Sequence, residues 1–171
     1  MHDIGSGNQA ALLVYRTPLN REKKGLVMDF ETVSAGEFGR SLQGIGVNLL
    51  CADVRATSAF FAEVFEMEVY RLSDDFAILR HASSIFQLHA DGTFEAHPLF
   101  AHIPENPPRG GGAQFYLFGL DPDLCVARAE ARGDLVIEPA RDKPHGLREA
   151  TILSPDGYAC SPAIALQQGE G

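Results

Sequence analysis

Several short segments of the chain carry amide, hydroxyl, imidazole or aromatic side chains at alternate positions. Because alternate residues of a strand share one face, we expect these side chains to lie on the inward faces of their strands. Aromatic surface with a few neutral hydrogen-bonding groups is typical of a small-molecule site. In the alternative interpretation, the same polar groups satisfy one another around a filled core. The residues concerned are Asn48, Gln87, His89, Gln114, Tyr116, Phe118 and Ser161.

Acid–base chemistry and charge recognition would depend on single residues. Tyr116 or His89 would act as a general acid or base if it faced a cavity, although nothing in the sequence orients either one. Arg148 would bind a ligand carboxylate, or it would pair with an acidic residue at the surface. Because Arg148 and Glu149 are adjacent on a predicted strand, only one of them faces inward.

The histidines and glycines form no recognised catalytic motif. The four histidines between residues 81 and 102 have spacings that match no compact metal-binding motif, so we interpret those in the irregular part as solvated. The glycine run at 110–112 precedes a predicted strand and lacks the Lys and Ser or Thr of a phosphate loop. The functional hypothesis therefore depends on the alternating residues.

The composition narrows the class of protein. A length of 171 residues suits one domain with a well-packed core or two small fused modules. Hydrophobic residues make up 45% of the chain and charged residues 22%, as is usual for a folded globular protein. A net charge of −9 opposes binding to nucleic acid and anionic lipid. No apolar stretch reaches the roughly 18 residues of a membrane helix, and the 3 cysteines lack paired or zinc-like spacing. We expect a cytoplasmic protein without membrane or nucleic-acid partners.

Residues 1–40 show no sustained hydrophobic period. Glycines, Pro18 and a basic cluster interrupt this segment, and the excess of basic residues ends near Met28. We expect an N-terminal extension with little fixed structure. We hypothesise that Met28 is the biological start, or that the preceding residues form a poorly packed tail.

Residues 41–90 predict a first βαβββ module. Val47, Leu49 and Cys51 alternate with other residues as in a strand with one apolar face. Asp53 is expected to cap a helix, because apolar residues follow it at intervals of three and four. Turn residues separate the three short apolar runs that come next, which we expect to be strands near 68–72, 76–80 and 85–89.

The same order of elements is predicted a second time. Residues 91–111, rich in Pro, Gly and His, form an inter-module loop that borders a site. The second module covers residues 112–166, with Asp121 capping its helix and Gly133 ending it, and residues 167–171 form a tail. Its later strands are expected near 135–138, 147–153 and 158–165. An internal duplication therefore organises the chain.

Three segments resemble motifs of the vicinal oxygen chelate superfamily, which contains glyoxalase I, extradiol dioxygenases and bleomycin-resistance proteins. Residues 142–149, DKPHGLRE, and 154–158, SPDGY, resemble its ending P-W-G-x-R-E … D-P-D-G-N. Residues 51–66 resemble its first-module signature, with Glu66 in place of the usual Gly. The resemblance implies an α+β fold in which two tandem βαβββ modules form a curled mixed sheet around a cavity.

The resemblance also locates four positions at which metal-dependent relatives carry His or Glu ligands. Here those positions correspond to Gly46, Gln87, Gln114 and Ser161, with Phe115 as the alternative to Gln114. None of these side chains is the carboxylate or imidazole that a catalytic divalent metal prefers. We therefore expect no metal and no other cofactor.

Three functional hypotheses follow. The favoured one is a glyoxalase- or bleomycin-resistance-like protein that binds a small organic molecule, aromatic or cationic, in a metal-free cavity. The alternatives are a lyase or dioxygenase with an atypical metal site, using ligands such as His89 and Gln114, and a metal-free acid–base enzyme. Since relatives usually dimerise and free sheet edges gain from pairing, we also expect a homodimer.

Overall fold

The computed structural model describes residues 28–103 and 108–167. Its elements, in chain order, are α1 (Ala35–Ser41), β1 (Val47–Cys51), α2 (Val54–Phe65), β2 (Glu68–Tyr70), β3 (Phe76–His81), β4 (Ser84–Ala90), the 3₁₀ turns η1 (Asp91–Phe94) and η2 (Pro98–His102), β5 (Gln114–Phe118), α3 (Pro122–Arg132), β6 (Leu135–Asp142), β7 (Leu147–Leu153) and β8 (Ala159–Ala165). Among these residues, no helix is long and apolar enough to cross a membrane.

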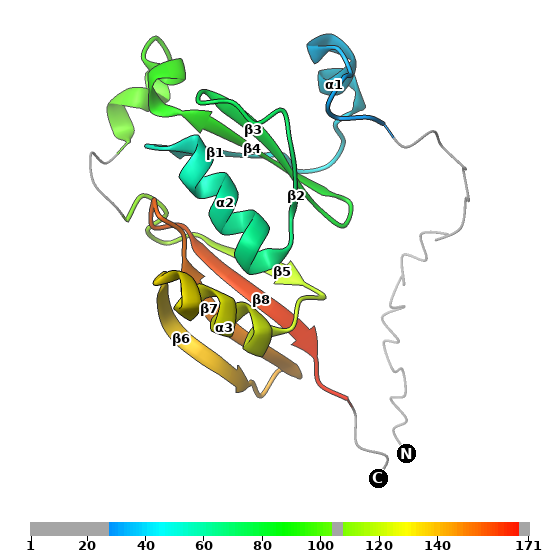
Figure 1. Cartoon of the computed structure of the whole chain (residues 1–171), viewed down its shortest axis with the longest axis vertical. Coiled ribbons are helices and arrows are strands. Elements are labelled where there is room, and N and C mark those ends of the chain that lie inside the picture. The colour runs from blue at the N-terminus through cyan, green and yellow to red at the C-terminus, as the bar shows by residue number, and fades with distance from the viewer. Residues whose placement is uncertain (1–27, 104–107, 168–171) are drawn as a thin grey trace, which may run out of the picture.

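The strands form two four-stranded mixed sheets with the same topology (Figure 1). The first has the order β1-β4-β3-β2 and the second β5-β8-β7-β6, and in each the first and last strands of the module pair in parallel. The predicted α+β fold with a duplicated βαβββ unit is therefore confirmed. Within the described residues the two sheets stay separate and no closed barrel forms.

The helix boundaries follow from capping residues that the sequence analysis identified. The carboxylate of Asp53 accepts a hydrogen bond from the amide of Ala56 at the start of α2, and that of Asp121 accepts from Asp123 and Leu124 at the start of α3. Gly133 ends α3 in the left-handed conformation. Glu66 adopts that conformation at the end of α2 with φ of 54°, where glycine would be unstrained.

One hydrophobic core extends through both modules. Phe60, Phe61 and Phe65 of α2 pack on the first sheet, and this cluster is continuous with Leu117 of β5 and Cys125 of α3. The Phe86 ring lies edge-on to the Phe115 ring of the second module, with centroids 5.9 Å apart. Because the modules share buried surface, neither has a complete core of its own.

The faces of each sheet differ in what covers them. Leu49 and Leu88 belong to the core beneath α2, so Asn48 and Gln87, one position away, lie on the opposite face. In the second sheet Leu117 belongs to the core beneath α3, and Tyr116 lies on the opposite face. We call these opposite surfaces the helix-free faces.

Helix α1 was not expected, because its segment had been assigned to an extension without regular elements. A capping box starts it: Ser34 and Glu37 exchange side-chain to backbone hydrogen bonds. Phe38 is buried edge-on to Phe30, whose ring also contacts Tyr70 of β2. These local and tertiary contacts order residues 28–41, whereas the hypothesis about residues 1–27 falls outside the described residues.

The Pro-Asp-Gly segment forms the predicted turn between β7 and β8. The amide of Gly157 donates to the carbonyl of Ser154 at 2.8 Å, and Gly157 has φ of 81°. A Cβ atom at residue 157 would lie 2.4 Å from Cα of Pro108. The glycine is therefore required by its conformation and by the close approach of the inter-module loop.

We expect Gly157→Ala to lower the free energy of unfolding by about 3 kcal/mol, because backbone strain and overpacking act together. Gly146→Ala is the matched control: Gly146 has φ of 86°, but nothing lies within 4 Å of its Cβ position. That variant should lose only about 1 kcal/mol. Urea unfolding measures both, and equal losses would contradict the role of the close approach.

Candidate functional site

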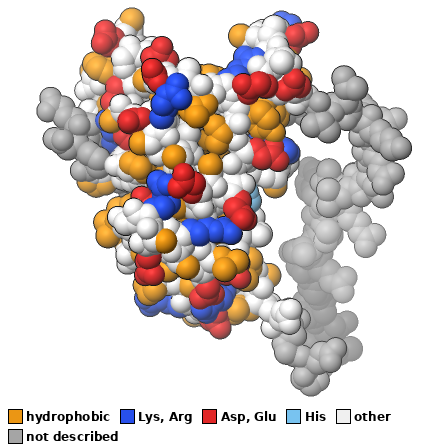
Figure 2. Space-filling view, viewed as in Figure 1, with side chains coloured by type: hydrophobic (Ala, Val, Ile, Leu, Met, Phe, Trp, Pro, Cys, Tyr) orange, Lys and Arg blue, Asp and Glu red, His pale blue; other side chains and the backbone are white. Residues whose placement is uncertain are grey.

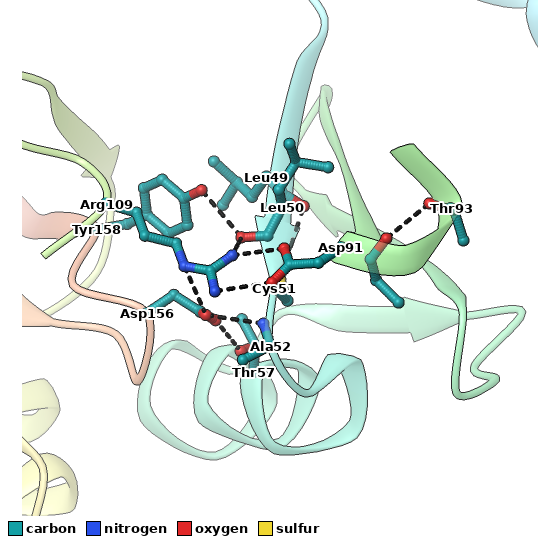
Figure 3. A network of polar contacts seen from close by, with 11 residues as sticks. Leu49, Leu50, Cys51, Ala52, Thr57, Asp91, Thr93, Arg109, Asp156 and Tyr158 are labelled. Carbon is teal, nitrogen blue, oxygen red and sulfur yellow. Dashed lines mark hydrogen bonds and ion pairs between the residues drawn. The ribbon is translucent and has the colours of Figure 1, made fainter. Parts of the chain in front are cut away.

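A buried ionic network connects the two modules (Figure 3). The carboxylate of Asp156, in the β7–β8 turn, accepts hydrogen bonds from the amide of Ala52 at 2.9 Å and the hydroxyl of Thr57 at 2.8 Å. Nε of Arg109 lies 3.5 Å from the same carboxylate, and both side chains are at most 4% exposed. The turn of the second module is thereby fixed to the start of α2 in the first.

Arg109 also closes the base of the inter-module loop. Its two terminal nitrogens donate to the carboxylate of Asp91 at 2.5 and 2.8 Å, and its backbone amide donates to the carbonyl of Asp156 at 2.9 Å. The hydrogen bonds to Asp91 raise the pKa of Arg109, whereas its burial lowers that pKa. The effect of the hydrogen bonds is larger, so the pKa of Arg109 is raised. Asp91 and Arg109 therefore hold the two ends of the loop together.

Residues 94–103 and Arg109 of the loop border a pocket of about 360 Å³ on the helix-free face of the first sheet, which we call the loop pocket. Its lining includes Asn48 and Leu50 of β1, Phe94, His97 and His102 of the loop, and Tyr158 of the second module. Leu50 is buried there, and the Tyr158 hydroxyl donates to its carbonyl at 3.0 Å. The pocket combines apolar walls with a few hydrogen-bonding groups, as small-molecule sites do.

Three predicted site residues belong to this region. The side-chain amide of Gln87 donates to the side-chain oxygen of Asn48 at 3.0 Å. The His89 ring lies 5.2 Å from the ring of Phe94, which in turn lies 5.1 Å from His97. Burial lowers the pKa of His89, which favours the neutral imidazole. Asn48 thus lines the loop pocket, whereas Gln87 and His89 lie beside it and contact its lining residues Asn48 and Phe94.

The other inward residues form a second group on the helix-free face of the second sheet. The amide of Gln114 donates to the hydroxyl of Ser161 at 2.6 Å and lies 3.4 Å from that of Thr151. Tyr116 and Phe118 are stacked, with ring centroids 5.6 Å apart. Gln114 and Thr151 border a shallow hollow that shares no lining residue with the loop pocket. The structure therefore distributes the predicted residues over two places, where one cavity was expected.

Arg148 lies on the other face of its strand. It forms ion pairs with Asp123 of α3 and with Asp142, at 2.6 and 2.7 Å, so its guanidinium is engaged on the α3 side. Arg148 therefore points away from the helix-free face, and its contacts correspond to the alternative expectation that it pairs with acidic residues at the surface. Its neighbour Glu149 faces the helix-free side and is only 5% exposed. The alternation of the two residues was the signal, but the sequence did not say which one faced inward.

The positions that correspond to metal ligands in the similar superfamily hold neutral groups. Gly46 precedes β1, which begins at Val47, and Gln114 is hydrogen-bonded to Ser161. Among residues 28–103 and 108–167, no three His, Cys, Asp or Glu side chains converge as a metal-binding group. His89, one of the two suggested atypical ligands, therefore belongs to no such group. These residues do not fit a divalent metal centre.

Solved structures share this fold. A glyoxalase/bleomycin resistance protein/dioxygenase family enzyme from Burkholderia phytofirmans is 20% identical over 71% of this chain and 97% of its own, with a TM-score of 0.61. A glyoxalase/bleomycin resistance protein/dioxygenase from Nocardioides is 18% identical over 80% and 95%, with a TM-score of 0.57. Lactoylglutathione lyase from Agrobacterium tumefaciens is 21% identical over 71% of this chain and 92% of its own, with a TM-score of 0.50.

No family model matches the sequence, and no curated protein is similar to it. At these identities the structural likeness establishes the fold, and it is consistent with the superfamily that the motifs resemble. What the similar proteins bind or catalyse does not transfer to this chain through the fold alone.

We expect Arg109→Ala to destabilise the protein by about 3 to 5 kcal/mol, because the buried carboxylate of Asp156 would lose its cationic partner. Arg55→Ala is the control, since Arg55 pairs with Asp74 at the surface, where both side chains are more than half exposed. The control should cost no more than about 1 kcal/mol. Similar losses in thermal unfolding would show that the network does not hold the modules together.

Proposed function

We propose that this protein binds a small organic molecule in the loop pocket and needs no metal ion to do so. The observation that carries the proposal is the loop pocket itself, formed where a tethered loop covers the helix-free face of the first sheet. Its volume of about 360 Å³ falls within the range of known ligand sites. Stacking on Phe94 and hydrogen bonds to Asn48 and His97 suit a planar, aromatic ligand.

The metal-free part of the proposal rests on the available side chains. Asn48, Gln87, Gln114 and Ser161 offer amide and hydroxyl groups, and these are weak ligands for a transition metal. The same groups are good partners for an organic molecule with carbonyl, hydroxyl or amine groups. Lyase and dioxygenase chemistry through an atypical metal site is disfavoured because, among the described residues, His89 is not part of any group of three His, Cys, Asp or Glu side chains that could hold a metal.

A thermal-shift screen of small aromatic compounds should identify ligands, and a ligand at 100 times its Kd should add about 2.7 kcal/mol of stability. Phe94→Ala should weaken binding at least tenfold, because Phe94 lines the loop pocket. Phe118→Ala removes an exposed aromatic ring outside the pocket and should leave binding unchanged. EDTA should have no effect on any of these results.

Two results would contradict this proposal. If EDTA abolished binding, or if the purified protein contained stoichiometric transition metal, the site would not be metal-free. If ligands bound equally well to Phe94→Ala and to the natural protein, the loop pocket would not be the site.

We also propose that the protein forms a homodimer through the edge strand β6 of the second sheet. Leu135 and Ile137 of this strand are 60% and 53% exposed. Burying such apolar surface against a second copy is favourable, and pairing would protect the free edge of the sheet. Tyr116 and Phe118 belong to β5, which is the other edge of the same sheet, so this interface leaves them accessible.

Sedimentation at micromolar concentration should show twice the chain mass of 18.5 kDa. Ile137→Glu should shift the protein toward monomer, because it places a charge in the proposed interface. Leu124→Glu is the control, since Leu124 is 54% exposed on α3. A monomeric natural protein would refute the proposal, as would equal effects of the two variants.

We propose a cytoplasmic location because the cysteines are unpaired, and we expect no nucleic-acid or membrane partner because the net charge is negative. Cys51, Cys125 and Cys160 are buried and unpaired, and burial raises the pKa of Cys51 to about 12 and that of Cys125 to about 11. Such thiols are inert and suit a reducing compartment. The net charge of −9 argues against nucleic acid or anionic membrane surfaces as partners. Figure 2 shows acidic and basic groups interspersed on the face that carries α2 and α3.

A further inference from the structure

Glu149 is a buried carboxylate whose contacts with the described residues are all 3.2 Å or longer. It lies on the helix-free face of the second sheet and is 5% exposed. Its neighbours are the His145 imidazole at 3.2 Å, the Tyr116 hydroxyl at 3.4 Å and the Lys143 ammonium at 3.6 Å. Lys143 lies closer to Glu138, at 2.7 Å.

These distances leave the Glu149 carboxylate under-satisfied. A carboxylate has about four acceptor sites, and charge-assisted hydrogen bonds are normally about 2.7 to 2.9 Å long. Every contact of Glu149 is longer than that, and its nearest ammonium group is bound more tightly by Glu138. A buried carboxylate in such surroundings retains the capacity to accept a hydrogen bond or a proton.

The strand between Tyr116 and Glu149 brings these two side chains together. The strand β8 lies between β5 and β7. Its residue Ser161 is opposite Tyr116 of β5, and its residue Ala163 is opposite Glu149 of β7. Both of these small residues are buried. Side chains from β5 therefore reach across β8 to those of β7. A phenol and a carboxylate meet beside the exposed, stacked rings of Tyr116 and Phe118, which offer a flat surface to a planar molecule.

The phenol of Tyr116 is suited to donating a hydrogen bond. Burial and the nearby Glu149 carboxylate raise the pKa of Tyr116, so the phenol stays protonated and is able to donate a hydrogen bond. His145 is about half exposed and contacts the second oxygen of Glu149, whereas Tyr116 contacts the first. A base and a hydrogen-bond donor therefore lie side by side on one face of the sheet.

We propose that Glu149 and Tyr116 form a metal-free proton-transfer site on the second sheet, acting on a planar organic molecule with an acidic C–H bond. Glu149 takes the proton, and the electron pair of the C–H bond moves into the conjugated system of the substrate. Tyr116 donates a hydrogen bond to the oxygen on which negative charge develops. The proton on Glu149 then returns to the product or passes to water, and no oxidant, reductant or metal takes part.

The probe 5-nitrobenzisoxazole tests this chemistry directly. A base removes its ring C–H proton, the electron pair forms a nitrile, and the N–O bond breaks to give 2-cyano-4-nitrophenolate, which is followed by its absorbance. The natural protein should accelerate this reaction, and Glu149→Gln should lower kcat/KM at least 100-fold. Glu130→Gln is the control, because Glu130 is an exposed carboxylate on α3, which covers the opposite face of this sheet. Its rate should stay within twofold of that of the natural protein.

Two further variants separate the roles of the aromatic residues. Tyr116→Phe should lower kcat about tenfold with little change in KM, because it removes a hydrogen bond made in the transition state. Phe118→Ala should mainly raise KM, because it removes part of the stacking surface. Circular dichroism and thermal unfolding establish that each variant is folded.

The proposal is overturned if the folded natural protein gives no more acceleration than an equal concentration of acetate, whatever the variants do. It is also overturned if Glu149→Gln, once shown to be folded, retains the activity. Phe94→Ala should leave this reaction unchanged, since Phe94 belongs to the loop pocket. Failure of the loop-pocket proposal and failure of this one are therefore distinguishable.

Discussion

The carboxylate of Asp156 makes the interaction on which the arrangement of the two modules depends. It is buried at the module boundary, where the amide of Ala52 and the hydroxyl of Thr57 donate hydrogen bonds to it and the Arg109 guanidinium forms an ion pair with it at 3.5 Å. An unpaired charge in that position would be costly, so the modules gain stability in the arrangement that brings these three groups to the carboxylate. The same guanidinium binds Asp91, which couples the packing of the modules to the closure of the inter-module loop. A single ionic network thus holds the two modules together and holds the ends of the inter-module loop beside the loop pocket.

The duplicated modules have diverged in how they cover their helix-free faces. In the first module a loop tethered by Arg109 covers the sheet and leaves a pocket above Asn48 and Leu50. In the second, side chains from β5 reach over the small residues of β8 to β7, so Tyr116 meets Glu149. One topology therefore supports a pocket suited to binding and a surface suited to proton transfer. The difference arises from loop length and side-chain size, because the strand order is the same in both.

Neutral groups at the expected metal-ligand positions change what the fold does chemically. An amide or a hydroxyl satisfies a neighbouring polar group, as Gln114 and Ser161 do, whereas carboxylates at these positions would repel one another without a cation. The hydrogen-bonded pairs therefore stabilise the sheet with no metal bound. The interpretation that polar residues satisfy one another applies in part to the second sheet, and Glu149 is the exception to it.

The sequence alone determined the elements of the fold, because their signals are local. Helix caps at Asp53 and Asp121, the turn ending at Gly157 and the apolar alternation of the strands each depend on residues within a few positions of one another. Tertiary structure decided which member of the Arg148–Glu149 pair faces inward, and that the predicted site residues fall in two groups. The pairing of Arg109 with Asp156, the order of α1 and the position of the loop depend on contacts between residues far apart in the chain. Local patterns carry no information about which distant groups meet, since packing of the whole core selects them.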